Sequence, residues 1–152
     1  MTTLLGEFKA ITEALNAAGI EYAVCGGWAM AIHGLPRATM DIDLLILVED
    51  LERVLNVARS NGFDIEGLPL HFEIEIRRIS KVDIDTKELI TLDLLLIGEE
   101  YREIWDARQE IHWREGKASV VSREGLIKMK SLAGRPQDLV DIEKLTEVTD
   151  ES

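Results

Sequence analysis

The chain has 152 residues, 46% of them hydrophobic, which is a one-domain length with enough apolar side chains for a single sizeable core. Lys and Arg together number 17 against 29 Asp and Glu, and the formal net charge of −12 disfavours a nucleic-acid partner without excluding one. The single cysteine, Cys25, excludes an internal disulfide, and no apolar run is long enough to span a membrane. The N-terminus does not resemble a signal peptide, so we expect a cytoplasmic protein.

The spacing of apolar residues, with stops at glycine, asparagine and proline, predicts the elements of the first half of the chain. In order, these are a helix over about 3–18, a strand over 21–25, a short helix over 28–33, a strand over 39–48, a helix over about 51–60 and a half-exposed or edge strand over 72–82. The strand over 39–48 is apolar on both faces from Leu44 to Val48. This pattern is typical of a central strand that is covered on both sides.

The second half predicts a buried strand over 90–97, a helix over 99–110, a hairpin or extended pair over 111–121 and two closing helices over about 122–133 and 136–148. Helices and strands alternate at first, and later two strands follow one another. We therefore expect an α/β or α+β fold with a mixed central β-sheet flanked by helices. It would form one domain over 1–152, with a core over about 1–121 and a short C-terminal helical pair over about 122–149.

Carboxylates interrupt both of the most apolar strands. Asp41 and Asp43 share one face of their strand and lie roughly 7 Å apart, a spacing that suits two carboxylates sharing hard divalent cations. Surface D-x-D pairs are common, but these charges begin a very apolar strand, where they are costly unless a metal or hydrogen bonds hold them. Asp93 repeats the anomaly in the other strand. A third carboxylate is what two-metal catalysis needs to activate an attacking oxygen.

Gly26 and Gly27 end the strand before the short helix over 28–33. Their missing Cβ atoms would let backbone N–H groups approach a ligand closely, and the helix N-terminus would favour phosphate. Arg37 precedes Asp41 closely enough either to touch a phosphate or to neutralise the aspartates. The whole stretch therefore predicts a site for a polyphosphate and its metal ions.

The closing helices carry further cations with two open interpretations. Lys130 shares the apolar side of its predicted helix, an expensive position for a cation unless it snorkels or meets an anion. Arg135, Asp138 and Asp141 would either form a structural cluster with Lys130 or line the site.

The stretch G-G-W-A-M-A-I-H-G-L-P-R-A-T-M-D-I-D, with Asp93 later, resembles the DNA polymerase beta-type nucleotidyltransferase superfamily. Within it, the chain is similar to the small bacterial branch that includes abortive-infection toxin and antibiotic nucleotidyltransferases. The closing L-I-K-M-K-S-L-A-G-R-P-Q-D-L-V-D-I-E-K-L is also similar to the helical end of that branch, so the resemblance covers most of the chain. It implies a nucleotidyltransferase fold and an NTP substrate such as ATP. It also implies two magnesium ions, for which manganese could substitute.

The resemblance also implies roles for individual residues. Asp41 and Asp43 would be metal ligands, and Asp93 would be the third metal-site carboxylate and the activator of the acceptor hydroxyl. Gly26 and Gly27 would be the phosphate turn, and Arg37, Lys130 and Arg135 are the further candidates for binding the nucleotide. Trp28 departs from the family pattern, because many members have Ser or Thr next to the glycines. Either backbone amides suffice for phosphate binding, or Trp28 is a core residue and the phosphate grip is weaker.

These features predict a magnesium-dependent enzyme that moves a nucleoside monophosphate from NTP to a hydroxyl acceptor and releases pyrophosphate. A small-molecule or protein acceptor suits the acidic composition better than RNA, and a homodimer or a cognate partner protein could complete the cleft. The alternative is a non-catalytic binding or regulatory protein of the same fold, such as a toxin–antitoxin component. A cleft that joins the three aspartates with Lys130 or Arg37 would favour the enzyme, and a cleft filled by Trp28 would favour the alternative.

Overall fold

The computed structural model describes residues 4–35, 41–114 and 116–150. Its strands are β1 (Ala23–Cys25), β2 (Asp41–Ile46), β3 (Ile65–Glu66), β4 (Leu70–His71), β5 (Glu75–Val82), β6 (Leu89–Leu96), β7 (Gln109–Trp113) and β8 (Gly116–Val120). Its helices are α1 (Leu4–Ala17), α2 (Gly26–Ile32), α3 (Leu51–Ser60), α4 (Arg102–Asp106), α5 (Arg123–Ala133) and α6 (Pro136–Asp150), with 3₁₀ turns at Val48–Asp50 and Glu99–Tyr101.

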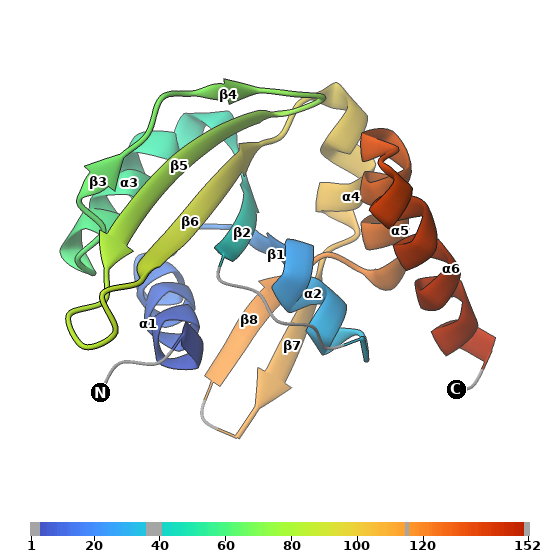
Figure 1. Cartoon of the computed structure of the whole chain (residues 1–152), viewed down its shortest axis with the longest axis horizontal. Helices are drawn as coiled ribbons and strands as arrows, with labels where there is room; N and C mark the ends of the chain where they lie inside the picture. Colours follow the sequence, from blue (N-terminus) through green and yellow to red (C-terminus); the bar gives the residue numbers. More distant parts are fainter. Residues whose placement is uncertain (1–3, 36–40, 115, 151–152) are drawn as a thin grey trace.

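The described strands form one mixed sheet in the order β3-β5-β6-β2-β1-β8-β7, with β4 paired to β5 (Figure 1). β2 lies in the middle, parallel to β6 and antiparallel to β1. Its Leu44, Leu45 and Ile46 are fully buried, because helices and neighbouring segments cover both faces of the sheet. The mixed sheet flanked by helices confirms the predicted fold class, and the position of β2 confirms the predicted central strand.

Two pairs of helices frame the sheet. α1 packs against α3, and the half-buried Lys81 of β5 reaches α1, where it binds both oxygens of Glu7 at 3.0 Å. At the other end of the sheet, α5 packs against both α4 and α6 (Figure 1). None of the helices in the described ranges is long and apolar enough to cross a membrane.

Three predicted elements differ from the structure. The helix predicted over 99–110 ends at Asp106, because residues from Gln109 onward pair with β8, and strand pairing overrides the local helical pattern. The short helix begins at Gly26 rather than Trp28, so the glycine pair lies in its first turn. β5 is half-exposed, as one of the two predicted alternatives has it, but it begins at Glu75 rather than at residue 72, and β3 and β4 pair with its outer side.

Candidate active site

Three carboxylates meet on one face of the central strands. Asp41 and Asp43 lie on β2, and the Cα of Asp43 is in register with that of Asp93 on the parallel strand β6. In-register neighbours point to the same face of a sheet. All three line a single cleft of about 660 Å³, a size typical of sites that take cofactors and small molecules.

The cleft walls come from segments far apart in the sequence. β2, β6 and the junction of β1 with α2 supply the carboxylates and Gly26. One wall comes from β5 and the residues just before it, and the opposite wall from α5 and the start of α6. The wall residues are Phe72, Glu73, Ile74, Ile76 and Arg78 on the first side, and Leu126, Met129, Lys130, Ala133, Arg135 and Asp138 on the other.

The two β2 carboxylates are held in a setting that disfavours their charge. Burial raises the pKa of Asp43 to about 7, and the neighbouring charges of Asp93 and Asp41 add to the rise. Burial, followed by the charge of Asp93, also raises the pKa of Asp41. A bound cation would relieve this repulsion, and carboxylate oxygens are the donors that Mg²⁺ prefers. Asp41 and Asp43 therefore fit a hard divalent cation.

Asp93 differs from the two β2 carboxylates, because an arginine donates hydrogen bonds to both of its carboxylate oxygens. Arg78 Nε donates to Asp93 Oδ1 at 2.8 Å, and Nη2 donates to Oδ2 at 3.1 Å. Within the described ranges, no group of three or more His, Cys, Asp or Glu side chains is arranged to hold a metal ion. Arg78 did not stand out as a site residue in the sequence, although it follows Ile74 and Ile76 at the two-residue spacing that puts side chains on one face of an extended strand.

Gly26 lies directly against Asp43. It adopts φ +64°, and a Cβ at this position would overlap the Asp43 carboxylate. Cys25 caps α2 without a side-chain hydrogen bond, and its thiol pKa is raised first by burial and then by the charges of Asp43 and Asp93. A thiol with this pKa stays protonated, which is consistent with an unreactive packing role.

Trp28 lies outside the cleft. Its ring stacks on Phe8 of α1, with centroids 4.3 Å apart and planes 9° apart. It is therefore a packing residue, as one of its two interpretations predicted, and it leaves the cleft open. Arg37, predicted to contact nucleotide or aspartate, lies outside the described residues.

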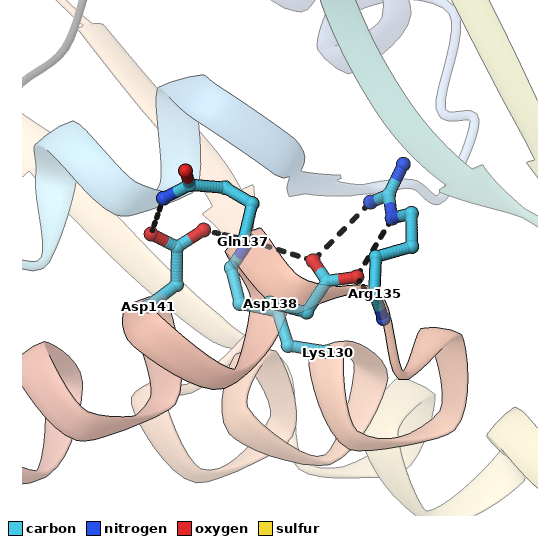
Figure 2. Close-up of polar contacts among 5 residues, drawn as sticks. All are labelled: Lys130, Arg135, Gln137, Asp138 and Asp141. Carbon is cyan, nitrogen blue, oxygen red and sulfur yellow. Dashed lines mark hydrogen bonds and ion pairs between the residues drawn. The ribbon is translucent and has the colours of Figure 1, made fainter.

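The cations of the closing helices form the predicted cluster and also reach the cleft (Figure 2). Lys130 Nζ lies 2.8 Å from Asp141 Oδ2 and 3.6 Å from Asp138 Oδ1. Arg135 Nε donates to Asp138 Oδ2 at 2.7 Å, and Gln137 donates to Asp141 Oδ1 at 2.9 Å. Burial alone would raise the pKa of Asp138, but the hydrogen bonds from Arg135 hold it below its ordinary value. The cluster thus joins the two closing helices and also contributes Lys130, Arg135 and Asp138 to the lining of the cleft.

A second cavity of about 330 Å³ adjoins the cleft, with Glu73, Ile74 and Tyr101 common to both. Its lining includes four glutamates, which are Glu73, Glu75, Glu99 and Glu100. Burial, and then the charges of Glu73 and Glu100, raise the pKa of Tyr101 to about 12. The cavity is therefore lined mainly by acidic side chains, of which Glu75 is paired with Arg77, and this lining favours a cationic ligand.

Solved structures of nucleotidyltransferases share this fold. They include a candidate nucleotidyltransferase from Thermotoga maritima (TM-score 0.65, 15% identity, 97% of this chain and 93% of that chain). The lincomycin-bound lincosamide antibiotic adenylyltransferase LnuA has a TM-score of 0.59 and 15% identity, over 93% of this chain and 96% of that one. ANT(2'')-Ia in complex with adenylyl-2''-tobramycin has a TM-score of 0.61 and 16% identity, over 91% and 84%. The chain has the nucleotidyltransferase fold.

A family model of aminoglycoside-2''-adenylyltransferases matches residues 7–122. The chain therefore belongs to this family, and it is a nucleotidyltransferase enzyme. A search of curated proteins finds no match to the sequence.

Proposed function

We propose that the protein is a metal-dependent adenylyltransferase that moves AMP from ATP to a hydroxyl of a cationic small molecule. The observation that carries the proposal is the meeting of Asp41, Asp43 and Asp93 on one face of β2 and β6 at the cleft. Membership of the aminoglycoside-2''-adenylyltransferase family supports the reaction type. The complex of ANT(2'')-Ia with adenylyl-2''-tobramycin supports an antibiotic-like acceptor.

In this proposal, Asp41 and Asp43, together with Asp93, would hold two magnesium ions, or manganese in their place. Such ions stabilise negative charge on the reacting phosphate and on the leaving pyrophosphate. Asp93 accepts the proton of the acceptor hydroxyl as the hydroxyl oxygen bonds to the α-phosphorus. The bond from the α-phosphorus to the oxygen bridging to the β-phosphate breaks, and pyrophosphate leaves with that oxygen.

The phosphates would be positioned by groups on either side of the carboxylates. Gly26 and Gly27 begin α2, so their N–H groups are among those that a helix leaves without an internal partner. Lys130 and Arg135 would add positive charge from the opposite wall. We also propose that Arg37, which lies outside the described residues, contacts a phosphate. The described residues of one chain supply all these other groups, so we propose that a single domain carries the metal and nucleotide sites.

The acceptor class follows from the second cavity. Four glutamates line it beside the cleft, and the chain as a whole carries a formal charge of −12. An acceptor bearing several ammonium groups would be attracted, whereas RNA would be repelled. We therefore propose an aminoglycoside-like polyamine with free hydroxyls as the acceptor.

The test is AMP transfer from labelled ATP to a panel of aminoglycosides, lincosamides and neutral sugars, followed by mass shift of the acceptor. Asp41→Asn, Asp43→Asn and Asp93→Asn should each lower the rate by at least about 100-fold, because each removes a metal-binding or proton-accepting group. Asp85→Asn is the matched control, since Asp85 belongs to a second D-x-D in the exposed turn after β5. Absence of transfer to every acceptor, together with absence of magnesium-dependent ATP binding, would refute the proposal.

A further inference from the structure

Arg78 and Asp93 form a two-point ion pair across neighbouring strands. Their Cα atoms are in register between β5 and β6, and the guanidinium donates to both carboxylate oxygens at 2.8 and 3.1 Å. The Asp93 side chain is only 8% exposed, whereas that of Arg78 is 45% exposed at the cleft. The buried Asp93 is therefore held by the side chain of Arg78, which is itself partly open to solvent.

The charge of Arg78 reaches all three carboxylates. Its guanidinium is bound to Asp93, and its field also opposes the rise in the pKa of Asp41 and of Asp43. Two further cations line the cleft: Arg135 pairs with Asp138, and Lys130 pairs with Asp141 and Asp138 while its charge also opposes the rise in the pKa of Asp43. Arg78 thus occupies the position of a counter-ion to the carboxylate cluster.

Arg77 provides an internal comparison. It is the preceding residue on the same strand, but side chains alternate along β5, and its Nε binds Glu75 at 3.0 Å. It is absent from the cleft lining. The two arginines therefore have the same charge and are neighbours on β5. They differ in the face of the strand on which they lie and in the carboxylate that they hold.

We propose that Arg78 is a positioning residue that masks Asp93 and competes with the metal for it. While the guanidinium holds both oxygens, Asp93 is unavailable as a shared metal ligand and as the acceptor of the hydroxyl proton. Binding of the metal with its nucleotide displaces Arg78 toward solvent and frees Asp93 to join Asp41 and Asp43. This inference rests on the proposed metal-dependent transfer.

The test measures Mn²⁺ binding without nucleotide, by electron paramagnetic resonance, in the full-length protein. Arg78→Gln should bind Mn²⁺ about tenfold more tightly than the wild type, because one positive charge leaves the site and two oxygens are released. Arg77→Gln should match the wild type. Asp43→Asn serves as the control for nonspecific binding. Mn²⁺ that still binds this variant is bound loosely to the acidic surface and not in the cleft.

A double-mutant cycle establishes whether the effect passes through Asp93. In an Asp93→Asn background, Arg78→Gln should raise Mn²⁺ affinity clearly less than in the wild-type background, because only the charge effect of Arg78 on Asp41 and Asp43 remains. Arg78→Lys keeps the charge but loses the two-point grip, so its affinity should lie between those of the wild type and Arg78→Gln. This variant also serves if Arg78→Gln does not fold.

Three results would overturn the inference. They are unchanged or weaker Mn²⁺ binding by Arg78→Gln and Arg78→Lys, an equal gain in Arg77→Gln, and a full gain in the Asp93→Asn background. If the wild type nevertheless transfers AMP with Mn²⁺, the proposed function stands and only the masking role fails. If no variant binds Mn²⁺ in the cleft and no transfer occurs, both fail.

Discussion

At the scale of single residues, the most constrained position beside the site is Gly26. Its φ of +64° lies in the left-handed region, where residues other than glycine are strained. Its missing Cβ also makes room for the Asp43 carboxylate. A side chain here meets both obstacles at once. Gly19 has a similar φ of +69° but no atom within 4 Å of a Cβ, so it presents the first obstacle alone.

We predict that Gly26→Ala lowers the free energy of unfolding more than Gly19→Ala does. The backbone cost should be about 1 kcal/mol at either position, and the overlap at Gly26 should add about 1–3 kcal/mol. Gly26→Ala should also reduce AMP transfer by at least about 100-fold, because Asp43 must move, and small displacements of reacting groups are costly. Urea denaturation and the transfer assay measure these effects. Equal losses of stability and of activity in the two variants would mean that Asp43 can move aside without affecting either.

At the scale of elements, the α5–α6 pair shows how a helix junction supplies one wall of the cleft. Ser122 caps α5 by accepting a hydrogen bond from the Gly125 N–H, and Gly134 ends α5 with φ +64°. The turn brings Asp138 and Asp141, which are 1% and 0% exposed, against Lys130. Two buried carboxylates therefore depend on cations that also face the cleft.

We predict that Lys130→Met destabilises the protein by about 3–5 kcal/mol, because it removes a cation that two buried carboxylates share. Lys128→Met is the matched control, since Lys128 lies on the same helix but pairs with the exposed Glu103, and it should leave the melting temperature unchanged. Thermal unfolding with and without the substitutions measures both.

The same variant separates the structural role of Lys130 from its proposed nucleotide role. At a temperature where Lys130→Met is folded, its KM for ATP should rise about tenfold, as expected for the loss of one phosphate contact worth about 1.4 kcal/mol. An unchanged KM would assign Lys130 to the helix junction alone.

At the scale of the whole molecule, the formal charge of −12 should govern the encounter with substrates. At saturating ATP, kcat/KM for an aminoglycoside acceptor should fall by roughly tenfold as ionic strength rises from about 0.02 to 0.2 M, because salt screens its attraction to the acidic surface. The N-acetylated form of the same acceptor lacks the charges and should show little salt dependence. Similar slopes for the two acceptors would contradict a steering role.

Much of this arrangement is local and was therefore predictable. The apolar run from Leu44 onward identified the central strand, and strand alternation placed Asp41 and Asp43 on one face. Gly134 marked the end of α5 and Pro136 the start of α6. Each of these features depends on residues within a few positions of one another.

The remaining features depend on which distant segments pair. The local pattern over 99–110 predicted one helix, but pairing with β8 converted its end into β7. Alternation along β5 fixes the face on which Arg78 lies, but only the register with β6 gives it Asp93 as partner. The sequence by itself therefore determined the central strands β2 and β6 and the carboxylates that they carry. The tertiary structure decided which cation each carboxylate meets, because strand register and helix docking are set by packing across the whole sheet.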